Sequence, residues 1–227
     1  MNQVRDLFNK ISPTYDLINR VLSFGQDVAW RKKVARHLPA RPHLQILDLA
    51  TGTADQLLAF FRTPGASIHK AIGLDVAEEM LKIGRTKIGS FPIELIAGDA
   101  QAIPFGEHRF DVVSISFGIR NVADPSKALR EMHRVLKPKG RCLILEFSIP
   151  SKPIRPFFLF YLRHVLPRLG GWLSKQNFAY RYLNQTIEAF PSGEPFLDLM
   201  RAAGFSQLKQ VPMNLGSVRL YIGEKGT

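Results

Sequence analysis

Apolar and polar positions follow one repeating unit along most of the chain, a short apolar run and then a longer amphipathic stretch. Apolar runs bounded by turn residues occupy 44–50, 69–76, 93–100, 110–117 and 141–148. Such runs predict strands that are buried on both faces. The stretches 54–62, 77–88 and 124–137 predict helices, the last starting with Asp124 as cap and Pro125 in the first turn. Strands and helices in alternation predict an α/β fold with a doubly wound, mostly parallel sheet.

The repeating unit is absent from the beginning of the chain and breaks again after Ser148. Residues 1–38 predict a helical cap, and the aromatic, proline-containing segment 149–192 predicts a helical lid insertion of two or three short helices. Near the end, a helix closing at Gly204 precedes two alternating segments that predict an antiparallel edge of the sheet. The chain 1–227 is therefore expected to be one domain, divided into 1–38, a core at 44–148, the insertion 149–192, and 193–227.

Composition agrees with one folded domain and adds a strong positive charge. Of the 227 residues, 45% are hydrophobic and 22% are charged, which is close to the average for globular proteins. The single cysteine, Cys142, lies in an apolar run and predicts a buried thiol with no internal disulfide. No signal-peptide pattern and no membrane-spanning run is visible, so we expect a cytoplasmic protein. The net charge of +12 favours nucleic acid, an anionic membrane surface or an acidic substrate as partner.

The loop after the first predicted strand, 47–55, reads "LDLATGTAD" and indicates the charge of its ligand. It has one glycine, Gly52, where dinucleotide motifs use three, and Asp48 and Asp55 bracket it. A pyrophosphate would be repelled by these carboxylates, whereas a cation would be attracted. S-adenosylmethionine carries a sulfonium and an ammonium and no phosphate. The loop therefore predicts this cofactor.

Further short polar residues end the next strands. Asp75 follows the second strand, where a carboxylate can accept hydrogen bonds from both ribose hydroxyls. Asp99 ends the third strand beside the small Ala100, and this pair suits an adenine ring and its amino group. Ser116 ends the fourth strand. Because the carboxyl ends of parallel strands meet at one edge of the sheet, these residues together predict a nucleoside site.

Several longer stretches resemble one known family. "LDLATGTAD", "GLDVAEEML", "GDAQAIPF" and the segment 110–148 are similar to the successive motifs of class I S-adenosylmethionine-dependent methyltransferases. "YDLINRVLSFGQDVAW", "FGIRNV" and "RVLKPKGRCLILEFS" resemble more narrowly the menaquinone and ubiquinone biosynthesis C-methyltransferase family. The resemblance covers nearly the whole chain. It implies a Rossmann-like, seven-stranded sheet and an enzyme that methylates a ring carbon of a prenylated quinol.

The resemblance also assigns roles to individual residues. It implies that the cofactor is held by Thr53, Asp75, Asp99, Ala100 and Ser116, to which the loop argument adds Asp48, Gly52 and Asp55. Arg120 and Asn121, just past the fourth strand, are the candidates for quinol contacts, because a guanidinium can stabilise a developing phenolate. The resemblance places Tyr15, Asp16 and Asn19 over the site. His164 and Tyr180 in the insertion are candidate substrate contacts, and the general base is left unassigned.

The chain departs from the family pattern at a few positions. Thr51 and Lys139 stand where the family often has glycine, and Ile18 stands where it often has methionine. Asp27 replaces a frequent histidine, which puts in doubt any mechanism that uses that imidazole as base. The six histidines are scattered, so no metal site is expected.

The insertion suits a substrate with an insoluble tail. Five aromatic side chains lie there among basic residues, namely Phe157, Phe158, Phe160, Tyr161 and Trp172. Aromatic and basic residues together favour docking on anionic lipid, here the inner face of the cytoplasmic membrane. An ordinary lid packed on the core explains the same residues, and the two interpretations are compatible.

Other functions share part of this pattern. An RNA methyltransferase would suit the charge, but we expect no nucleic acid because no additional RNA-binding module is visible. An O- or N-methyltransferase of small molecules would share every cofactor motif. Asp48 disfavours a nicotinamide dehydrogenase, and the intact cofactor motifs disfavour a non-catalytic scaffold. The choice between a naphthoquinol and a benzoquinol acceptor, the tail length and the formation of a homodimer are left open.

Overall fold

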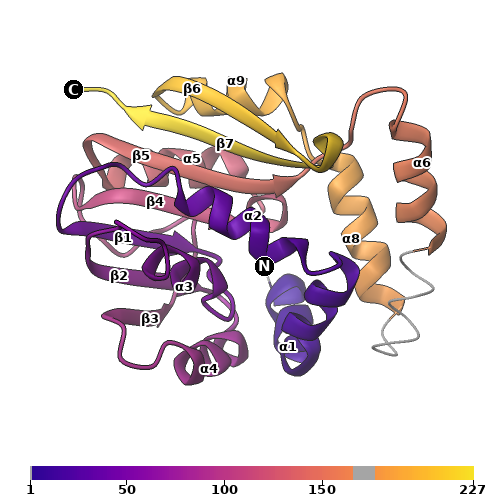
Figure 1. Ribbon diagram of the computed structural model, residues 1–227, viewed down its shortest axis with the longest axis horizontal. Coiled ribbons are helices and arrows are strands. Elements are labelled where there is room, and N and C mark those ends of the chain that lie inside the picture. The colour runs from indigo at the N-terminus through magenta and orange to yellow at the C-terminus, as the bar shows by residue number, and fades with distance from the viewer. Residues whose placement is uncertain (1, 166–176) are drawn as a thin grey trace.

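The computed structural model describes residues 2–165 and 177–227 and is built around a seven-stranded sheet (Figure 1). The strand order is β3-β2-β1-β4-β5-β7-β6. The strands are β1 (Leu44–Leu49), β2 (Ile68–Asp75), β3 (Ile93–Ala97), β4 (Phe110–Ser116), β5 (Leu136–Phe147), β6 (Phe205–Met213) and β7 (Val218–Lys225).

Helices precede, connect and follow these strands. Those described are α1 (Asn2–Leu22), α2 (Gln26–Ala35), α3 (Asp55–Phe61), α4 (Glu78–Lys87), α5 (Pro125–Val135), α6 (Arg155–Phe160), α8 (Asn177–Ala189) and α9 (Glu194–Ala202). Shorter helical turns are η1 (Ile119–Asn121), η2 (Tyr161–Val165) and η3 (Asn214–Gly216).

Strand pairing confirms the predicted fold class. Strands β1 to β5 pair in parallel, β7 pairs antiparallel with β5, and β6 pairs antiparallel with β7. The five predicted apolar runs coincide with β1 to β5. Strand β5 begins at Leu136, before the predicted 141, because the backbone stays paired through an irregular register between Phe110 and Val112 on β4. The sheet is thus doubly wound and mostly parallel, with an antiparallel C-terminal edge.

Helices cover both faces of the sheet and bury two apolar clusters. Helices α5 and α9 pack on one face, and α2 and α3 pack on the other. The buried helical side chains include Leu129, Met132, Phe196 and Met200 on the first face and Trp30, Val34, Leu57 and Phe60 on the second. Cys142 lies fully buried in the first cluster, as predicted, and burial raises the pKa of its thiol.

The remaining helices lie beyond the carboxyl ends of the parallel strands. Figure 1 shows α6 and α8 on the side toward which β4 and β5 point, with α1 below them. Helix α1 contacts α2 and α4, and α8 contacts η1. Helices α6 and α8 belong to the predicted insertion, whose Trp172 lies outside the described residues. These helices enclose the rim of the sheet where the sequence predicts the site.

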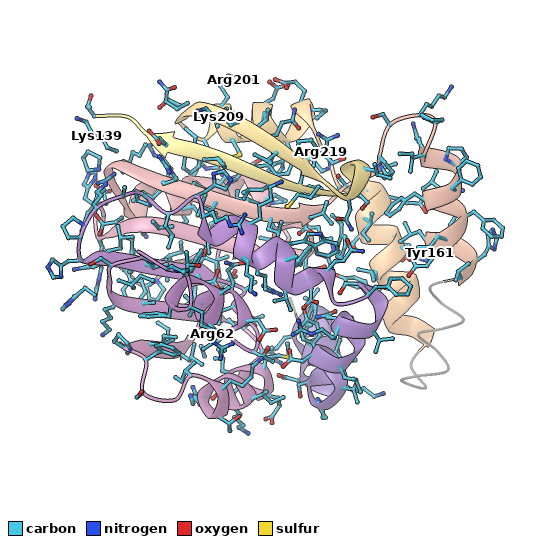
Figure 2. The ribbon with its side chains drawn as sticks, viewed as in Figure 1. Arg62, Lys139, Tyr161, Arg201, Lys209 and Arg219 are labelled. Atoms are coloured by element: carbon cyan, nitrogen blue, oxygen red, sulfur yellow. The ribbon has the colours of Figure 1, made fainter. Side chains whose placement is uncertain are left out.

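Positive charge is spread over several elements. Figure 2 shows Arg62 after α3, Lys139 in β5, Lys209 in β6 and Arg201 in α9 at separate places around the molecule. The net charge of +12 is therefore not confined to the insertion.

Candidate active site

The loop between β1 and α3 bends sharply around the ends of β1 and β2. Ala50, Gly52 and Ala54 have φ values of 46°, 56° and 66°. This left-handed backbone is easiest for small residues and glycine. The Thr51 N–H donates to the Leu74 carbonyl at 3.2 Å, and the Gly52 N–H donates to Asp75 Oδ2 at 2.8 Å. The loop is thus fixed to the carboxyl end of β2.

Asp75 ends β2 and holds two loops at once. Its Oδ1 accepts from the Ala77 N–H and its Oδ2 from the Gly52 N–H, both at 2.8 Å. Burial raises the pKa of this carboxyl group, and the backbone N–H groups oppose the rise. Each carboxylate oxygen has a second lone pair that a ribose hydroxyl can use.

A cavity of about 210 Å³ lies over this loop at the ends of the parallel strands. Two carboxylates, Asp75 and Asp99, border it, and none of its described lining residues is basic. Its other lining residues include Ala50, Gly52, Val76, Met80, Gly98, Ala100, Gln101, Ser116 and Val122. Apolar walls with carboxylates and no cation fit a positively charged nucleoside such as S-adenosylmethionine and disfavour a pyrophosphate.

Two glycines that line this cavity have no room for a side chain. A Cβ atom on Gly118 would lie 2.5 Å from the Ala50 Cβ, and one on Gly98 would lie 2.5 Å from Leu74 Cδ1. Both distances are far below van der Waals contact. Larger residues here would push the lining of the cavity out of place.

Three of the predicted cofactor residues, Asp48, Thr53 and Asp55, do not line this cavity. Asp48 is 1% exposed, and its carboxylate accepts from the hydroxyls of Thr51 and Ser114 at 2.7 and 2.6 Å. Burial raises the pKa of Asp48 to about 6, and the two hydroxyls oppose the rise. Asp48 therefore supports the loop from beneath. Direct contact of Asp48, Thr53 or Asp55 with a cofactor stays a prediction.

Thr53 and Asp55 belong instead to a polar cluster around Lys87. The Lys87 ammonium donates to Asp16 Oδ2 at 2.7 Å, to the Thr53 hydroxyl at 2.9 Å and to Asp55 Oδ1. The Thr53 hydroxyl donates in turn to Asp16 Oδ1 at 2.7 Å. Asp16, predicted to face the substrate, thus ties α1 to the cofactor loop and to α4.

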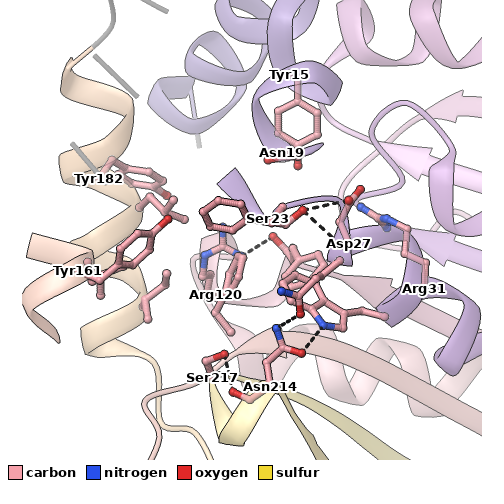
Figure 3. Close-up of a pocket in the computed structure, with 18 of the residues that line it drawn as sticks. Tyr15, Asn19, Ser23, Asp27, Arg31, Arg120, Tyr161, Tyr182, Asn214 and Ser217 are labelled. Carbon is pink, nitrogen blue, oxygen red and sulfur yellow. Dashed lines mark hydrogen bonds between the residues drawn. The ribbon is translucent and has the colours of Figure 1, made fainter. Parts of the chain in front are cut away.

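A second cavity of about 270 Å³ lies beside the first and is mostly apolar (Figure 3). Its walls come from α1, α2, α6, α8 and the ends of β4 and β5. Apolar side chains dominate, among them Leu7, Ile11, Trp30, Phe147, Phe158, Leu162, Leu183 and Ile187. Phe8, Tyr15 and Phe117 line both cavities. These three rings form the wall between the two cavities.

Arg120 reaches the larger cavity from η1 in a fixed position. Its Nη1 donates to Glu146 Oε1 and to the Phe117 carbonyl, both at 2.6 Å, and its guanidinium carbon lies 5.3 Å from the centre of the Phe147 ring. Burial raises the pKa of Glu146, and the Arg120 charge opposes the rise. Among the described residues Arg120 Nε has no hydrogen-bond partner. A ligand oxygen can therefore meet a cation that is already held in place.

The other predicted substrate residues occupy different parts of the site. Tyr15 lines both cavities, Asn19 lines the larger one, and Asn121 lines the smaller one. Asn121 Oδ1 accepts from the Tyr182 hydroxyl at 3.1 Å. His164 lines neither cavity, and its ring centre lies 5.1 Å from that of Phe160. The Tyr180 side chain lies outside the part of the molecule that the structure describes.

Sequence reasoning missed several polar residues of the larger cavity. These are Ser23, Arg31, Tyr182 and Asn214. Asp27 and Tyr161 also line the cavity, although the sequence marks Asp27 only as a departure from the family pattern and Tyr161 only as an aromatic residue of the insertion. Asn214 lies in η3, far along the chain, and its Oδ1 accepts from Trp30 Nε1 at 3.1 Å. A sequence signal existed only for α2, where Asp27, Trp30 and Arg31 follow helical spacing and share one face.

No described helix is both long enough and apolar enough to cross a membrane. Likewise, no group of three or more potential metal ligands occurs in the ranges 2–165 and 177–227.

The chain matches known proteins over its whole length. The model of the ubiE/COQ5 methyltransferase family matches residues 1–225. Demethylmenaquinone methyltransferase of Thermus thermophilus is 42% identical over 223 residues, covering 96% of this chain and 100% of the relative. The protein of that name from Chlorobaculum parvum is 39% identical, covering 99% and 93%. The ubiquinone/menaquinone biosynthesis C-methyltransferase UbiE of Geotalea uraniireducens is 40% identical, covering 98% and 96%.

Solved structures share the fold at low identity. A SAM-dependent methyltransferase of Thermotoga maritima, described as a possible histamine N-methyltransferase, has a TM-score of 0.69 at 21% identity, covering 97% of this chain and 99% of that one. A putative S-adenosylmethionine-dependent methyltransferase of Methanococcus maripaludis has a TM-score of 0.70 at 16% identity, covering 96% and 94%. At this identity the likeness shows the fold alone.

Proposed function

The chain belongs to the ubiE/COQ5 methyltransferase family, and from this premise we propose that it transfers a methyl group from S-adenosylmethionine to a ring carbon of a prenylated quinol. The main acceptor that we propose is demethylmenaquinol, because relatives at about 40% identity carry the name demethylmenaquinone methyltransferase. The benzoquinol of the ubiquinone branch is the alternative, since other relatives carry the name of both pathways.

One observation carries the proposal, namely two neighbouring cavities that share one wall and differ in their charged residues. The smaller has two carboxylates and no basic lining residue among those described, whereas the larger is mostly apolar and has two guanidinium groups, Arg31 and Arg120, with one carboxylate, Asp27. Phe8, Tyr15 and Phe117 border both. A cationic nucleoside in the first cavity and an apolar ring in the second would meet at these three residues.

The residues of the smaller cavity fit the methyl donor. Asp75 would accept hydrogen bonds from the ribose hydroxyls, Asp99 and Ala100 would receive the adenine, and Gly52 and Ser116 would allow close approach along the loop and β4. S-adenosylmethionine, when bound, supplies a methyl group activated by its sulfonium. The apolar wall of Phe8 and Phe117 excludes water from the place where the two cavities meet.

Arg120 orients and activates the quinol. Its guanidinium can donate to a ring hydroxyl and stabilise the negative charge that develops on that oxygen as the neighbouring carbon attacks. Glu146 and the Phe117 carbonyl hold Nη1, so the cation does not have to move during the reaction. The Tyr182 hydroxyl, which donates to Asn121, closes the cavity from α8.

The mouth of the larger cavity suits a substrate that arrives from a bilayer. Seven large hydrophobic side chains of the described residues are exposed. Six of these lie on elements that line the larger cavity, namely Leu17, Val21, Phe24, Phe157, Phe160 and Leu215. The seventh, Phe91, follows α4. We call these six residues the apolar rim.

Basic side chains accompany the apolar rim. Arg20 lies in α1, Lys152 in the turn before α6, Arg155 at the start of α6 and Arg163 in η2, and all four are exposed. Aromatic side chains can insert below the lipid headgroups while basic side chains bind anionic ones. We therefore propose that the rim docks on the inner face of the cytoplasmic membrane and receives the prenyl tail there.

The test is methyl transfer from labelled S-adenosylmethionine to two quinols in separate detergent mixtures, with cofactor binding measured by calorimetry. We expect label in reduced demethylmenaquinone. Label in the demethylated benzoquinol alone would move the protein to the ubiquinone branch, and label in both would make it an enzyme of both. If neither quinol is labelled although the cofactor binds, the quinol assignment is wrong.

A further inference from the structure

Asp27 is the carboxylate among the described lining residues of the larger cavity, and one of its two oxygens has no hydrogen-bond partner among the described residues. It lies in the first turn of α2, lines the cavity and is 5% exposed. The Ser23 hydroxyl donates to Oδ1 at 3.0 Å (Figure 3), and Arg20 Nη1 lies 3.3 Å from the same oxygen. Oδ2 has no hydrogen-bond partner among the described residues. A carboxylate oxygen that lines a cavity and has no hydrogen-bond partner is available to a ligand.

We propose that Asp27 is the general base of the methyl transfer, with Oδ2 as the atom that accepts the proton. The inference rests on the proposed function and adds a catalytic residue to it. When the quinol carbon bonds to the methyl group, the bond from that methyl to sulfur breaks, and the ring carbon then bears both a hydrogen and a methyl group. Asp27 takes this hydrogen as a proton, and the electron pair of the C–H bond restores the aromatic ring. The protonated carboxyl group later releases its proton to water.

The other titratable groups of the larger cavity are poor proton acceptors. Burial is the main cause that raises the pKa values of Tyr15, Tyr161 and Tyr182, so their hydroxyls stay protonated. Arg31 and Arg120 are guanidinium ions and cannot serve as bases. All six histidines lie in the described ranges, and none of them lines either cavity.

The acids nearest the larger cavity are already bound to protein groups. Glu146 is fully buried behind Arg120 and pairs with it. In the smaller cavity, both oxygens of Asp75 accept backbone N–H groups, and both oxygens of Asp99 lie within 3.3 Å of Gln101 Nε2. Among the described acids in and next to the two cavities, Asp27 is therefore the one with an oxygen that no protein group binds.

Asp27 lies on the face of α2 that packs near Phe117, one of the three rings between the cavities. Trp30 and Arg31 lie three and four residues further on, one turn along the same face. The Trp30 ring centre is 5.8 Å from that of Phe117, and the Arg31 guanidinium carbon is 5.6 Å from it. Since Phe117 borders both cavities, the face that carries Asp27 also borders the place where the methyl group would pass.

The experiment compares Asp27→Asn with Asp27→His and Asp27→Glu, using quinol that carries deuterium at the reacting carbon. Asparagine keeps the size and cannot take a proton, whereas imidazole and carboxylate can. We expect Asp27→Asn to lower kcat by roughly 10²–10⁴-fold, the usual contribution of a general base. Proton removal then becomes rate-limiting, so the deuterium isotope effect should rise above the wild-type value. Asp27→His should recover most of the loss, and Asp6→Asn, which removes an exposed carboxylate of α1, is the matched control.

A second readout does not depend on turnover. Quinone binding is followed by quenching of tryptophan fluorescence, to which Trp30 of the larger cavity contributes, and Asp27→Asn should bind with wild-type affinity. A kcat loss below about tenfold would lie under the range of general-base catalysis and overturn the proposal. So would a folded Asp27→Asn variant that has lost binding and shows the wild-type isotope effect, since Asp27 would then only position the substrate. If the wild type methylates no quinol, the proposed function itself is wrong, and the role of Asp27 is wrong with it.

Discussion

Arg120 and Glu146 form an ion pair at the boundary of the larger cavity, with Nη1 2.6 Å from Oε1 and side chains that are 7% and 0% exposed. Oε1 also accepts from the Phe147 N–H at 2.8 Å. The acid sits at the end of β5, so the central sheet itself fixes the position of the guanidinium. The role of the pair is to position the guanidinium, because two buried charges add little net stability compared with apolar side chains.

Removing one charge of this pair should be costly. In Glu146→Gln the Arg120 cation stays buried without its counterion, and we expect the free energy of unfolding to fall by about 3–5 kcal/mol. Urea denaturation followed by circular dichroism measures this. Glu194→Gln, which neutralises an exposed acid on α9, should change it by no more than about 0.5 kcal/mol. Equal losses in the two variants would contradict the role given to the pair.

Asp48 should make the protein less stable as the pH rises. Burial raises its pKa from the ordinary 3.8 of an aspartate to about 6 in the folded protein. The folded state therefore binds more protons between these values, and stability falls across that window as the pH increases. The shift of about two units corresponds to roughly 3 kcal/mol.

The Asp48→Asn variant lacks this titration. The wild type should lose about 3 kcal/mol of its free energy of unfolding between pH 4 and pH 6, and the variant should not show this loss. The hydroxyls of Thr51 and Ser114 can rotate to suit the amide group. Denaturation of both proteins at several pH values tests this, and parallel pH profiles would show that the buried carboxyl group is not the cause.

Lys87 should hold α1 in place against the cofactor loop. Its ammonium joins Asp16 of α1 to Thr53 and Asp55 of the cofactor loop. In Lys87→Met the two carboxylates repel each other without a cation between them. We expect faster amide hydrogen exchange in residues 9–19 and weaker binding of S-adenosylmethionine. Lys82→Met removes an exposed ion pair from the same helix and should leave the exchange rates in α1 unchanged.

The apolar rim should decide binding to membranes. Each inserted phenylalanine contributes about 1.5–3 kcal/mol, so Phe157→Ser with Phe160→Ser should lower the partition onto anionic vesicles by at least about a hundredfold. Co-sedimentation with phosphatidylglycerol vesicles measures the partition. Phe91→Ser, on the loop after α4, is the control. Undiminished binding of the double variant would show that the apolar rim does not bind the membrane. Binding of the wild type should weaken with added salt.

The fold could be predicted from local pattern because the parallel strands are uniformly apolar. Runs such as 110–117 and 141–148 have a single stable location, a sheet covered on both faces, and helices between them leave few topologies. The acids Asp75 and Asp99 were placed at the smaller cavity for the same reason. A residue that ends a parallel strand must lie at the rim of the sheet whatever the loops do.

The larger cavity could not be predicted in this way, because its residues come from segments with no fixed relation to the sheet. Tyr182 reaches Asn121 from α8, and Asn214 reaches Trp30 from η3. Nothing local in the sequence marks these pairs. Asp48 shows a second limit, since a strand-end acid can also turn inward, and only the surrounding hydroxyls of Thr51 and Ser114 reveal that it does.

The wall of Phe8, Tyr15 and Phe117 makes the two ligands interdependent. Two of these rings belong to α1, and all three border both cavities. We expect the ligand that binds first to fix the positions of these rings, so that the second ligand pays a smaller ordering cost. Linkage is reciprocal, so each ligand raises the affinity for the other by the same factor. The complex with both ligands is thereby favoured over either partial complex, and the activated methyl group is enclosed chiefly when an acceptor is present to receive it.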